Sequence, residues 1–379
     1  MPAEDNKAAA CWVMRLMNRK VIFMLLVMLF PSAVFSGVDF FNGQLSGTAG
    51  YNNNPGGKTE FSLRYIPETR VSYGKDKEKG IDAEMSLKAV VSSTGTYGSA
   101  GMDLYRLSLR YFTPVFEARF GLQKINFGPA RIFRSLMWFD RIDPRDPFGI
   151  TSGVTGMLLR YYMKNNSNIW AWFLVPGNET KGLEAIKTDK HHGELGARAQ
   201  VPVEKGEVGI SFNGRYVDPD DWIFKMGSVI SDGREMKVAF DGSWDLGIGL
   251  WFEAALNNNI ITSSSNMFTG FLTAGADYTL GNCLFVTLEQ FFSNSGSALD
   301  ELTFNRSFTG ILASYPVSVF DNVNAIIYYD WMNNKAYLFA GYQRTFDNFK
   351  YNLMVYTSDA NTASYISGNG VRFIVTYYH

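Results

Sequence analysis

The densest group of chemically active side chains in this sequence lies between residues 125 and 153. Acids and bases interleave along this stretch, and the charged residues of interest are Arg131, Arg134, Asp140, Arg141, Asp143, Arg145 and Asp146. Fixed charges of both signs in a narrow water-filled passage create a transverse electric field, which selects hydrated polar solutes by size and charge. The pattern therefore predicts a charged constriction.

The same stretch is rich in apolar side chains such as Phe127, Trp138 and Phe139, which favour burial and argue against disorder. A connection of this length without its own secondary structure is usually functional or disordered. We therefore expect an ordered functional loop. Two alternatives stay open: the charges at 140–146 form a salt-bridge network that pins a plug, or the loop binds a ligand.

A constriction also needs charges on the opposing wall, and the polar faces of several predicted strands supply them. These lumen-lining candidates are Arg106, Arg110, Glu117, Arg119, Arg160 and Arg198. Because five of the six are bases, we expect them to face the acids of the loop.

Catalytic and metal chemistry find little support. The chain has three histidines, His191, His192 and His379, and neighbouring side chains in an extended loop point apart, so that joint metal ligation is awkward. Neither a Gly-x-Ser-x-Gly elbow nor a His-Glu-x-x-His motif occurs. We predict no enzyme activity, no catalytic residue, no metal site and no cofactor.

Carboxylates also gather between residues 218 and 232, where Asp218, Asp220, Asp221 and Asp232 could offer Ca²⁺ hard oxygen ligands. Their spacing lacks the Gly and the distant Glu of a helix–loop–helix calcium site. A solvated acidic loop is the favoured interpretation.

The elements that must position these residues follow a period of two. Leu107, Leu109 and Tyr111, for example, alternate with Arg106, Ser108 and Arg110, a pattern that a helix of period 3.6 would scatter around its circumference. The predicted strands are 41–51, 59–73, 81–92, 103–112, 115–124, 154–163, 168–176, 193–201, 207–217, 234–244, 247–257, 268–279, 282–292, 305–315, 322–332, 336–346, 349–357 and 369–379. The count falls to sixteen if 41–51 and 305–315, the weakest patterns, are not strands.

The connections between these strands alternate in length. Short turns such as 113–114, 245–246 and 347–348 alternate with longer loops at 52–58, 93–102, 125–153, 177–192, 218–233, 258–267, 293–304 and 358–368, and only 333–335 breaks the rule. A membrane barrel has this asymmetry, with short periplasmic turns and long extracellular loops. A soluble sandwich has no reason to sort its loops in this way.

Membrane insertion explains the remaining composition. Hydrophobic residues make up 46% of the chain, yet no run after residue 36 is long enough for a spanning helix, whereas nine to twelve residues suffice for a tilted strand. Inside lipid, an open sheet edge is too costly, so the sheet must close with its apolar faces outward. Interfacial aromatic girdles are then expected from Tyr111, Trp172, Tyr216, Trp244, Tyr278, Tyr315, Trp331, Tyr342 and Tyr377.

The N-terminus predicts export. Basic residues precede an apolar decamer at 21–30, and small residues follow up to Ser36, which is the pattern of a signal peptide with cleavage after Ser36. Residues 1–36 are thus interpreted as a signal peptide with an upstream extension, and 37–379 as one barrel domain. Cleavage removes four of 35 bases and two of 36 acids, leaving 31 against 34 and a net charge of −3. Nothing in this balance favours nucleic acid as a partner.

The last strand carries a resemblance to a known class. Val371, Phe373, Val375 and Tyr377 alternate up to the chain end, and the whole mature chain resembles porin-like outer-membrane β-barrel proteins of bacteria. The usual final residue of that class is Phe, and His379 departs from it. The resemblance implies an all-β fold, a closed antiparallel transmembrane barrel of about eighteen strands, and assembly by the barrel-assembly machinery. In porins a long loop after the fifth strand folds inward and narrows the pore, and the loop at 125–153 is similar in position and composition, so the resemblance also implies that this loop folds inward.

The function that follows is a porin-like channel in the bacterial outer membrane, through which small hydrophilic solutes diffuse passively past the loop at 125–153. The expected partners are outer-membrane lipids, the barrel-assembly machinery, small polar solutes and copies of the chain in a homotrimer. The alternative is a surface barrel closed by its own loops that binds or helps to assemble extracellular polysaccharide, for which loop aromatics such as Trp222 and Phe224 could stack on sugars.

Overall fold

A computed structural model describes residues 40–53, 57–76, 78–95, 97–227, 233–262, 265–301, 303–357 and 368–379. The predicted signal peptide, residues 1–36, lies outside the described residues, as does Asp232. No helix among the described residues has the length and apolar character needed to cross a membrane.

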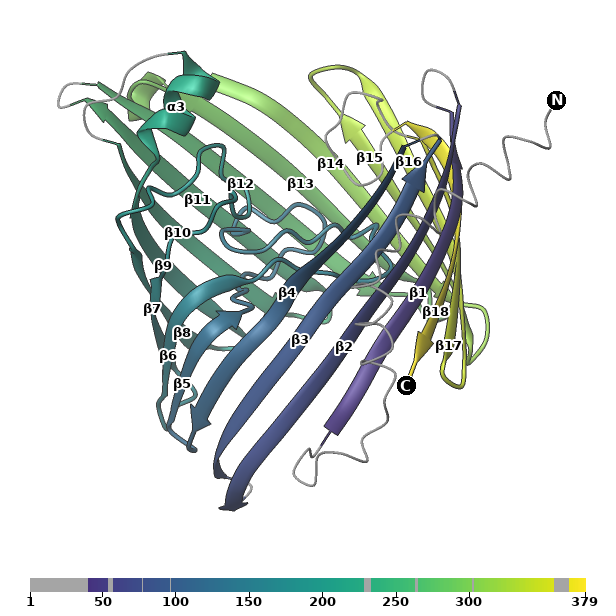
Figure 1. Cartoon of the computed structure of the whole chain (residues 1–379). Coiled ribbons are helices and arrows are strands. Elements are labelled where there is room, and N and C mark those ends of the chain that lie inside the picture. Colours follow the sequence, from purple (N-terminus) through teal and green to yellow (C-terminus); the bar gives the residue numbers. More distant parts are fainter. Residues whose placement is uncertain are drawn as a thin grey trace. The chain divides into compact units, whose positions relative to one another are not determined.

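The described chain consists almost entirely of strands, with one short α-helix and one 3₁₀ turn (Figure 1). The strands are β1 (Phe40–Asn52), β2 (Lys58–Asp76), β3 (Lys79–Thr94), β4 (Tyr97–Phe112), β5 (Phe116–Gln123), β6 (Val154–Tyr162), β7 (Asn168–Leu174), β8 (Glu194–Val203), β9 (Gly206–Tyr216), β10 (Arg234–Asp245), β11 (Gly249–Thr262), β12 (Ser265–Thr279), β13 (Phe285–Gly296), β14 (Thr303–Pro316), β15 (Asp321–Asp330), β16 (Lys335–Phe346), β17 (Phe349–Thr357) and β18 (Asn369–Tyr378). The helix α3 is Pro219–Met226 and the 3₁₀ turn η2 is Leu299–Glu301.

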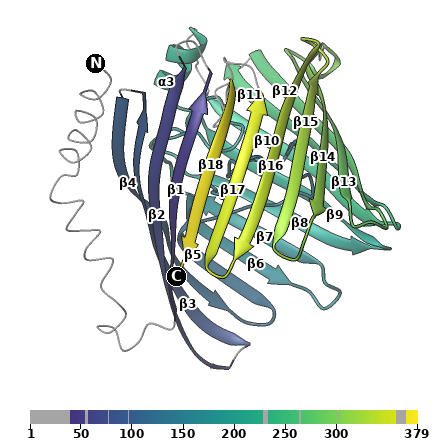
Figure 2. The ribbon, with the colours of Figure 1, turned by 90° about the vertical axis from the view of Figure 1, so that its right-hand side faces the viewer.

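The eighteen strands form one closed antiparallel sheet, which confirms the predicted barrel and excludes the sixteen-strand alternative. From β5 to β15 each strand pairs with the next one in the chain. The strands β17, β18, β1 and β2 also pair in this order, so that the last strand meets the first (Figure 2). Closure leaves no unpaired edge, as the bilayer demands.

The chain divides into two compact units. The first contains the described residues up to Tyr73, 82–107 and 341–379, and the second contains 74–81 and 108–340. Both long connections that bear on function, residues 124–153 and 175–193, belong to the second unit together with β5 to β15.

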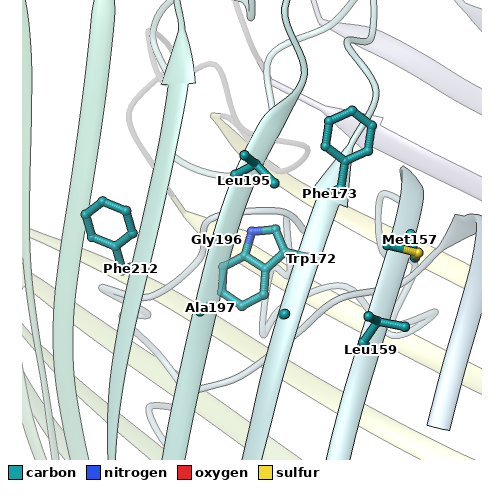
Figure 3. A pocket seen from close by; sticks show the side chains of 9 residues that line it. Met157, Leu159, Trp172, Phe173, Leu195, Gly196, Ala197 and Phe212 are labelled. Atoms are coloured by element: carbon teal, nitrogen blue, oxygen red, sulfur yellow. The ribbon is translucent and has the colours of Figure 1, made fainter.

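The two faces of the wall differ as predicted. Leu195, Ile210 and Phe240 are exposed on the outer face, whereas inward positions on the same part of the sheet hold buried polar side chains such as Lys237 and Glu253. Figure 3 shows part of the outer face, where the paired Ala171 and Ala197 lie in an apolar groove of about 330 Å³ that extends from β6 to β9. The exposed apolar side chains on this part of the sheet therefore point away from the lumen.

The prediction of long loops is wrong at two places in the chain. Residues 93–102 and 258–267 belong mostly to strands, because β3 and β4 are separated only by residues 95–96, and β11 and β12 only by 263–264. The strand ends in this region are polar, as in Asn257–Asn259, so hydrophobic alternation stops before hydrogen-bonded pairing does. The predicted acidic loop at 218–233 contains the helix α3.

Trp172 does not belong to an interfacial girdle. It points inward, is only 2% exposed, and its indole N–H donates to Asn213 Oδ1 at 2.8 Å. The interfacial prediction rests on the position of Trp172 near a strand end. However, alternate side chains of the seven-residue strand β7 point into the lumen, and Trp172 is one of them.

The unusual terminal residue His379 is built into the first unit. Its backbone exchanges hydrogen bonds with Gly43, and its ring stacks on Tyr65, whose hydroxyl lies 3.0 Å from His379 Nε2. A Cβ atom at Gly43 would lie 2.1 Å from the same imidazole nitrogen. The glycine thus makes room for the aromatic ring that ends the chain.

Candidate functional site: an inner loop on the lumen wall

The connection between β5 and β6, residues 124–153, is called the inner loop below because it packs against inward-facing side chains. Its apolar residues form one buried cluster with the inner faces of β6, β7, β10 and β11. The members are Ile125, Phe127, Leu136, Trp138, Phe139, Val154, Leu158, Trp172, Leu174, Ala239 and Ala255. A dry core of this kind fixes the loop in place.

Two wall carboxylates hold the backbone of the inner loop on strands far from its origin at β5. Glu253 on β11 accepts hydrogen bonds from the backbone N–H groups of Ala130 and Leu136, both at 2.9 Å. Glu289 on β13 accepts from three successive N–H groups, those of residues 131 to 133, at 2.6, 3.0 and 2.6 Å. Neither glutamate was a candidate from the sequence, although both occupy the inward side of alternating strands.

The predicted constriction charges all have partners. Arg134 and Asp140 form a buried pair at 3.4 Å, and Arg145 binds Asp143 at 2.8 Å. Asp146 accepts backbone N–H groups from residues 148 and 150. The loop's acids therefore serve the loop's own structure.

The two most exposed basic residues of the inner loop, Arg131 and Arg141, bind partners outside the loop. The guanidinium of Arg131, half exposed, pairs with Asp277 on β12 at 2.7 Å and lies over the ring of Trp251. Arg141 donates to Thr180 Oγ1 at 2.6 Å and to the carbonyl of Gly182 at 3.1 Å. The charge that the loop presents to solvent is thus positive.

Four of the five bases that the sequence predicts on the lumen wall bind acids of the wall. Arg110, Arg119 and Arg160 surround the buried carboxylate of Glu117 at 2.8, 3.1 and 3.7 Å. Farther along the wall, Arg198 forms a two-pronged pair with Asp241 at 2.6 and 2.8 Å. In the first unit, Arg106 donates to the carbonyl of Tyr105 at 2.6 Å. Glu117 is thus the shared partner of three guanidinium groups.

A second loop, residues 175–193, packs on the inner loop and on the wall. Leu183 N–H donates to the carbonyl of Met137 at 3.0 Å, and Glu184 lies in a buried cluster with Lys181, Arg215 and Lys237 at 3.2, 3.3 and 2.9 Å. Burial alone would raise the pKa of Glu184, but the three positive charges outweigh it and lower the pKa to about 2.

This pKa predicts that the second loop stays docked in moderate acid. The carboxyl is more acidic in the docked loop than its ordinary value of 4.5, so its stabilisation is complete above about pH 4.5 and is lost as the pH falls towards 2. A decrease of this size corresponds to about 3 kcal/mol. Pepsin, with a free peptide of the same sequence as the rate reference, should cut the loop at pH 2 and spare it at pH 4. Equal normalised rates at both pH values would contradict the prediction.

The acidic segment at 218–221 caps and docks α3. Asp218 Oδ1 accepts the N–H groups of Asp220 and Asp221 at 2.9 and 3.2 Å, and the Asp221 carboxylate binds Lys225 at 2.8 Å. Nowhere among the described residues do three or more His, Cys, Asp or Glu side chains gather as metal ligands would. His192 pairs with Asp189 at 2.7 Å.

No family model matches the sequence, and no curated protein matches it significantly. Solved structures do match over nearly the whole chain. Acinetobacter baumannii OccAB1 has a TM-score of 0.56 at 11% identity, covering 92% of this chain and 98% of its own. Pseudomonas aeruginosa OccK5 (OpdH) has a TM-score of 0.56 at 12% identity, covering 91% and 99%.

The in-vitro folded, trimer form of the Vibrio cholerae outer membrane protein OmpT has a TM-score of 0.50 at 10% identity, covering 90% of this chain and 98% of its own. Identities this low carry the fold alone. The predicted resemblance to porin-like outer-membrane barrels is confirmed at that level: the chain has the fold of these proteins.

Proposed function

We propose that this chain is a channel of the bacterial outer membrane through which small hydrophilic solutes diffuse passively, and that the inner loop narrows its lumen. The observation that carries the proposal is the course of the inner loop, which leaves the wall at β5 and binds Glu253 on β11 and Glu289 on β13 from the lumen side. A loop held across the inner face must reduce the open cross-section.

The charges suggest which solutes are favoured. Glu117 is buried while the arginines around it are partly exposed, and Arg131 is half exposed. A passing ion therefore meets an excess of positive charge, which favours anions. The interleaved acids of the original constriction hypothesis contribute less, because Asp140 and Asp146 are bound within the loop.

This proposal predicts anion-selective conductance across a planar bilayer that separates two KCl concentrations. Arg110→Gln should move the reversal potential towards that of potassium, because it removes one positive charge from the wall. A unit charge about 8 Å from an ion in water contributes about 0.5 kcal/mol, a factor of about two for each ion and of opposite sign for anion and cation, so the permeability ratio should change about fivefold. Lys164→Gln, in the exposed turn between β6 and β7, is the matched control and should change nothing.

A second candidate, a barrel closed by its own loops, is favoured by the dry apolar cluster beneath the inner loop. It predicts no conductance from well-folded protein, together with binding of extracellular polysaccharide. Of the two loop aromatics named above, Trp222 is buried, whereas Phe224 is 87% exposed and could stack on a sugar.

The channel proposal implies export by an N-terminal signal peptide, residence among outer-membrane lipids and insertion by the barrel-assembly machinery. It implies no cofactor and no enzyme activity. A homotrimer is part of the proposal, on the ground that OmpT is described in a trimer form. Cross-linking of the folded protein in detergent tests the trimer.

A further inference from the structure

Most of the hydrogen bonds that attach the segment 130–136 of the inner loop to the wall are made by its backbone. Five of its N–H groups point at the two carboxylates Glu253 and Glu289. Each oxygen of Glu289 accepts two hydrogen bonds, because the indole N–H of Trp251 joins the oxygen that also accepts from Arg131. Thr273 adds a hydrogen bond to the carbonyl of Phe133 at 2.7 Å.

No lysine or arginine side chain among the described residues forms an ion pair with either glutamate. The guanidinium of Arg131 pairs with Asp277 and that of Arg134 with Asp140. The N–H dipoles of the loop therefore stand where a counter-ion would at these buried groups, as in a concave anion-binding nest.

The wall around Glu289 is also shaped to receive the loop. Its cross-strand partners on both sides are glycines, Gly275 on β12 and Gly310 on β14. A Cβ atom at Gly310 would lie 2.7 Å from the ring of Phe133, and one at Gly275 would lie 2.5 Å from the indole of Trp251. The missing side chains make a socket at the height of the carboxylate.

We propose that Glu253 and Glu289 are positioning residues that fix the inner loop at one height on the lumen wall. They do so as acceptors of its backbone N–H groups. The docking itself is independent of transport. Only its consequence, a lumen of constant width, rests on the proposed function.

The decisive measurement is hydrogen exchange of the folded full-length barrel, followed by mass spectrometry of peptides that cover residues 130–136. Glu289→Gln keeps the shape of the side chain but replaces one carboxylate oxygen with an NH₂ group. The two N–H groups that this oxygen accepted then face a donor and lose their acceptor. Exchange in this segment should become about tenfold faster or more, as expected when buried donors lose their acceptor. Glu204→Gln, in the exposed turn between β8 and β9, is the control.

Gly310→Val tests the socket without touching a charge, and it should also accelerate exchange around Phe133. Folding of each variant is checked by its heat-dependent shift in gel electrophoresis. If Glu289→Gln does not fold, Glu253→Gln replaces it, because that change removes the acceptor of a single N–H group. Wild-type exchange rates in a folded carboxylate variant would overturn the proposal.

Current recordings separate this inference from the channel proposal. If the wild type conducts, Glu289→Gln should show larger current fluctuations at an unchanged barrel stability, which a merely structural role would not produce. If the wild type does not conduct, the channel proposal fails, and the exchange rates alone decide whether the glutamates position the loop.

Discussion

Replacing Glu184 with glutamine should release the second loop from the wall. The carboxylate is only 1% exposed and lies within 3.3 Å of Lys181, Arg215 and Lys237. The buried cluster balances three acids, Glu184, Glu194 and Glu235, against these three bases. Removal of one acid leaves an uncompensated positive charge in a dry site, which costs about 3–5 kcal/mol.

Trypsin reports this release directly, because Lys181 belongs to the cluster and its side chain also binds Glu194. The wild type should resist cleavage after Lys181, and Glu184→Gln should be cut there while the strands stay intact. Glu179→Gln, an exposed residue of the same loop, is the matched control. If both variants are cut equally slowly, the cluster does not hold the loop.

Release of the second loop should also affect the inner loop, because the two are joined by backbone and side-chain contacts. Leu183 N–H donates to Met137, and Arg141 binds both Thr180 and Gly182. A Cβ atom at Gly182 would lie 2.0 Å from the carbonyl oxygen of Met137. The two loops therefore form one packed body on this part of the wall.

The strands could be predicted because a lipid-facing wall imposes its pattern on every strand separately. Each needs apolar residues at every second position, so Leu195 or Ile210 indicates a face without knowledge of its neighbours. All eighteen strands were located in this way. The pattern gives no guidance at polar strand ends, where pairing continues through residues 257–259, and it therefore predicts long loops where the structure has two tight turns.

The attachment of the inner loop could not be predicted, because it depends on which strands face the loop after the barrel closes. Glu253 and Glu289 stand more than a hundred residues from the N–H groups they accept. Alternation placed them on the inner face together with many other polar residues. The glycines on both sides of Glu289 are a usable signal only when the register of β12, β13 and β14 is known.

The partners of the charged candidates differ from those that the sequence predicted. Arg119 and Arg160 bind Glu117 on the same wall and not the acids of the loop. Short-range pairs between neighbouring strands form whenever opposite charges share a face, and they require no fixed distance across the lumen. A field between loop acids and wall bases demands a geometry that sequence spacing does not contain.

Phe127→Ala should loosen the inner loop more than any change of a surface charge. The ring lies 5.5 Å from that of Trp138, 5.9 Å from that of Trp172 and 6.2 Å from that of Trp170, at the centre of the buried cluster. Its removal leaves a cavity between loop and wall, and a buried Phe→Ala change typically costs about 3–5 kcal/mol. The emission of the three tryptophans should shift to longer wavelength as water enters.

The control is Phe120→Ala, because Phe120 lies on β5 just before the inner loop but is exposed on the outer face. Its loss leaves no internal cavity, so urea unfolding in micelles should show a clearly smaller decrease in stability and no shift in emission. Equal losses for both variants would mean that the cluster beneath the loop is not a packed core. If the losses differ as expected, apolar packing determines how firmly the inner loop is held. The two wall carboxylates then determine the position at which it is held, because hydrogen bonds are directional and apolar contacts are not.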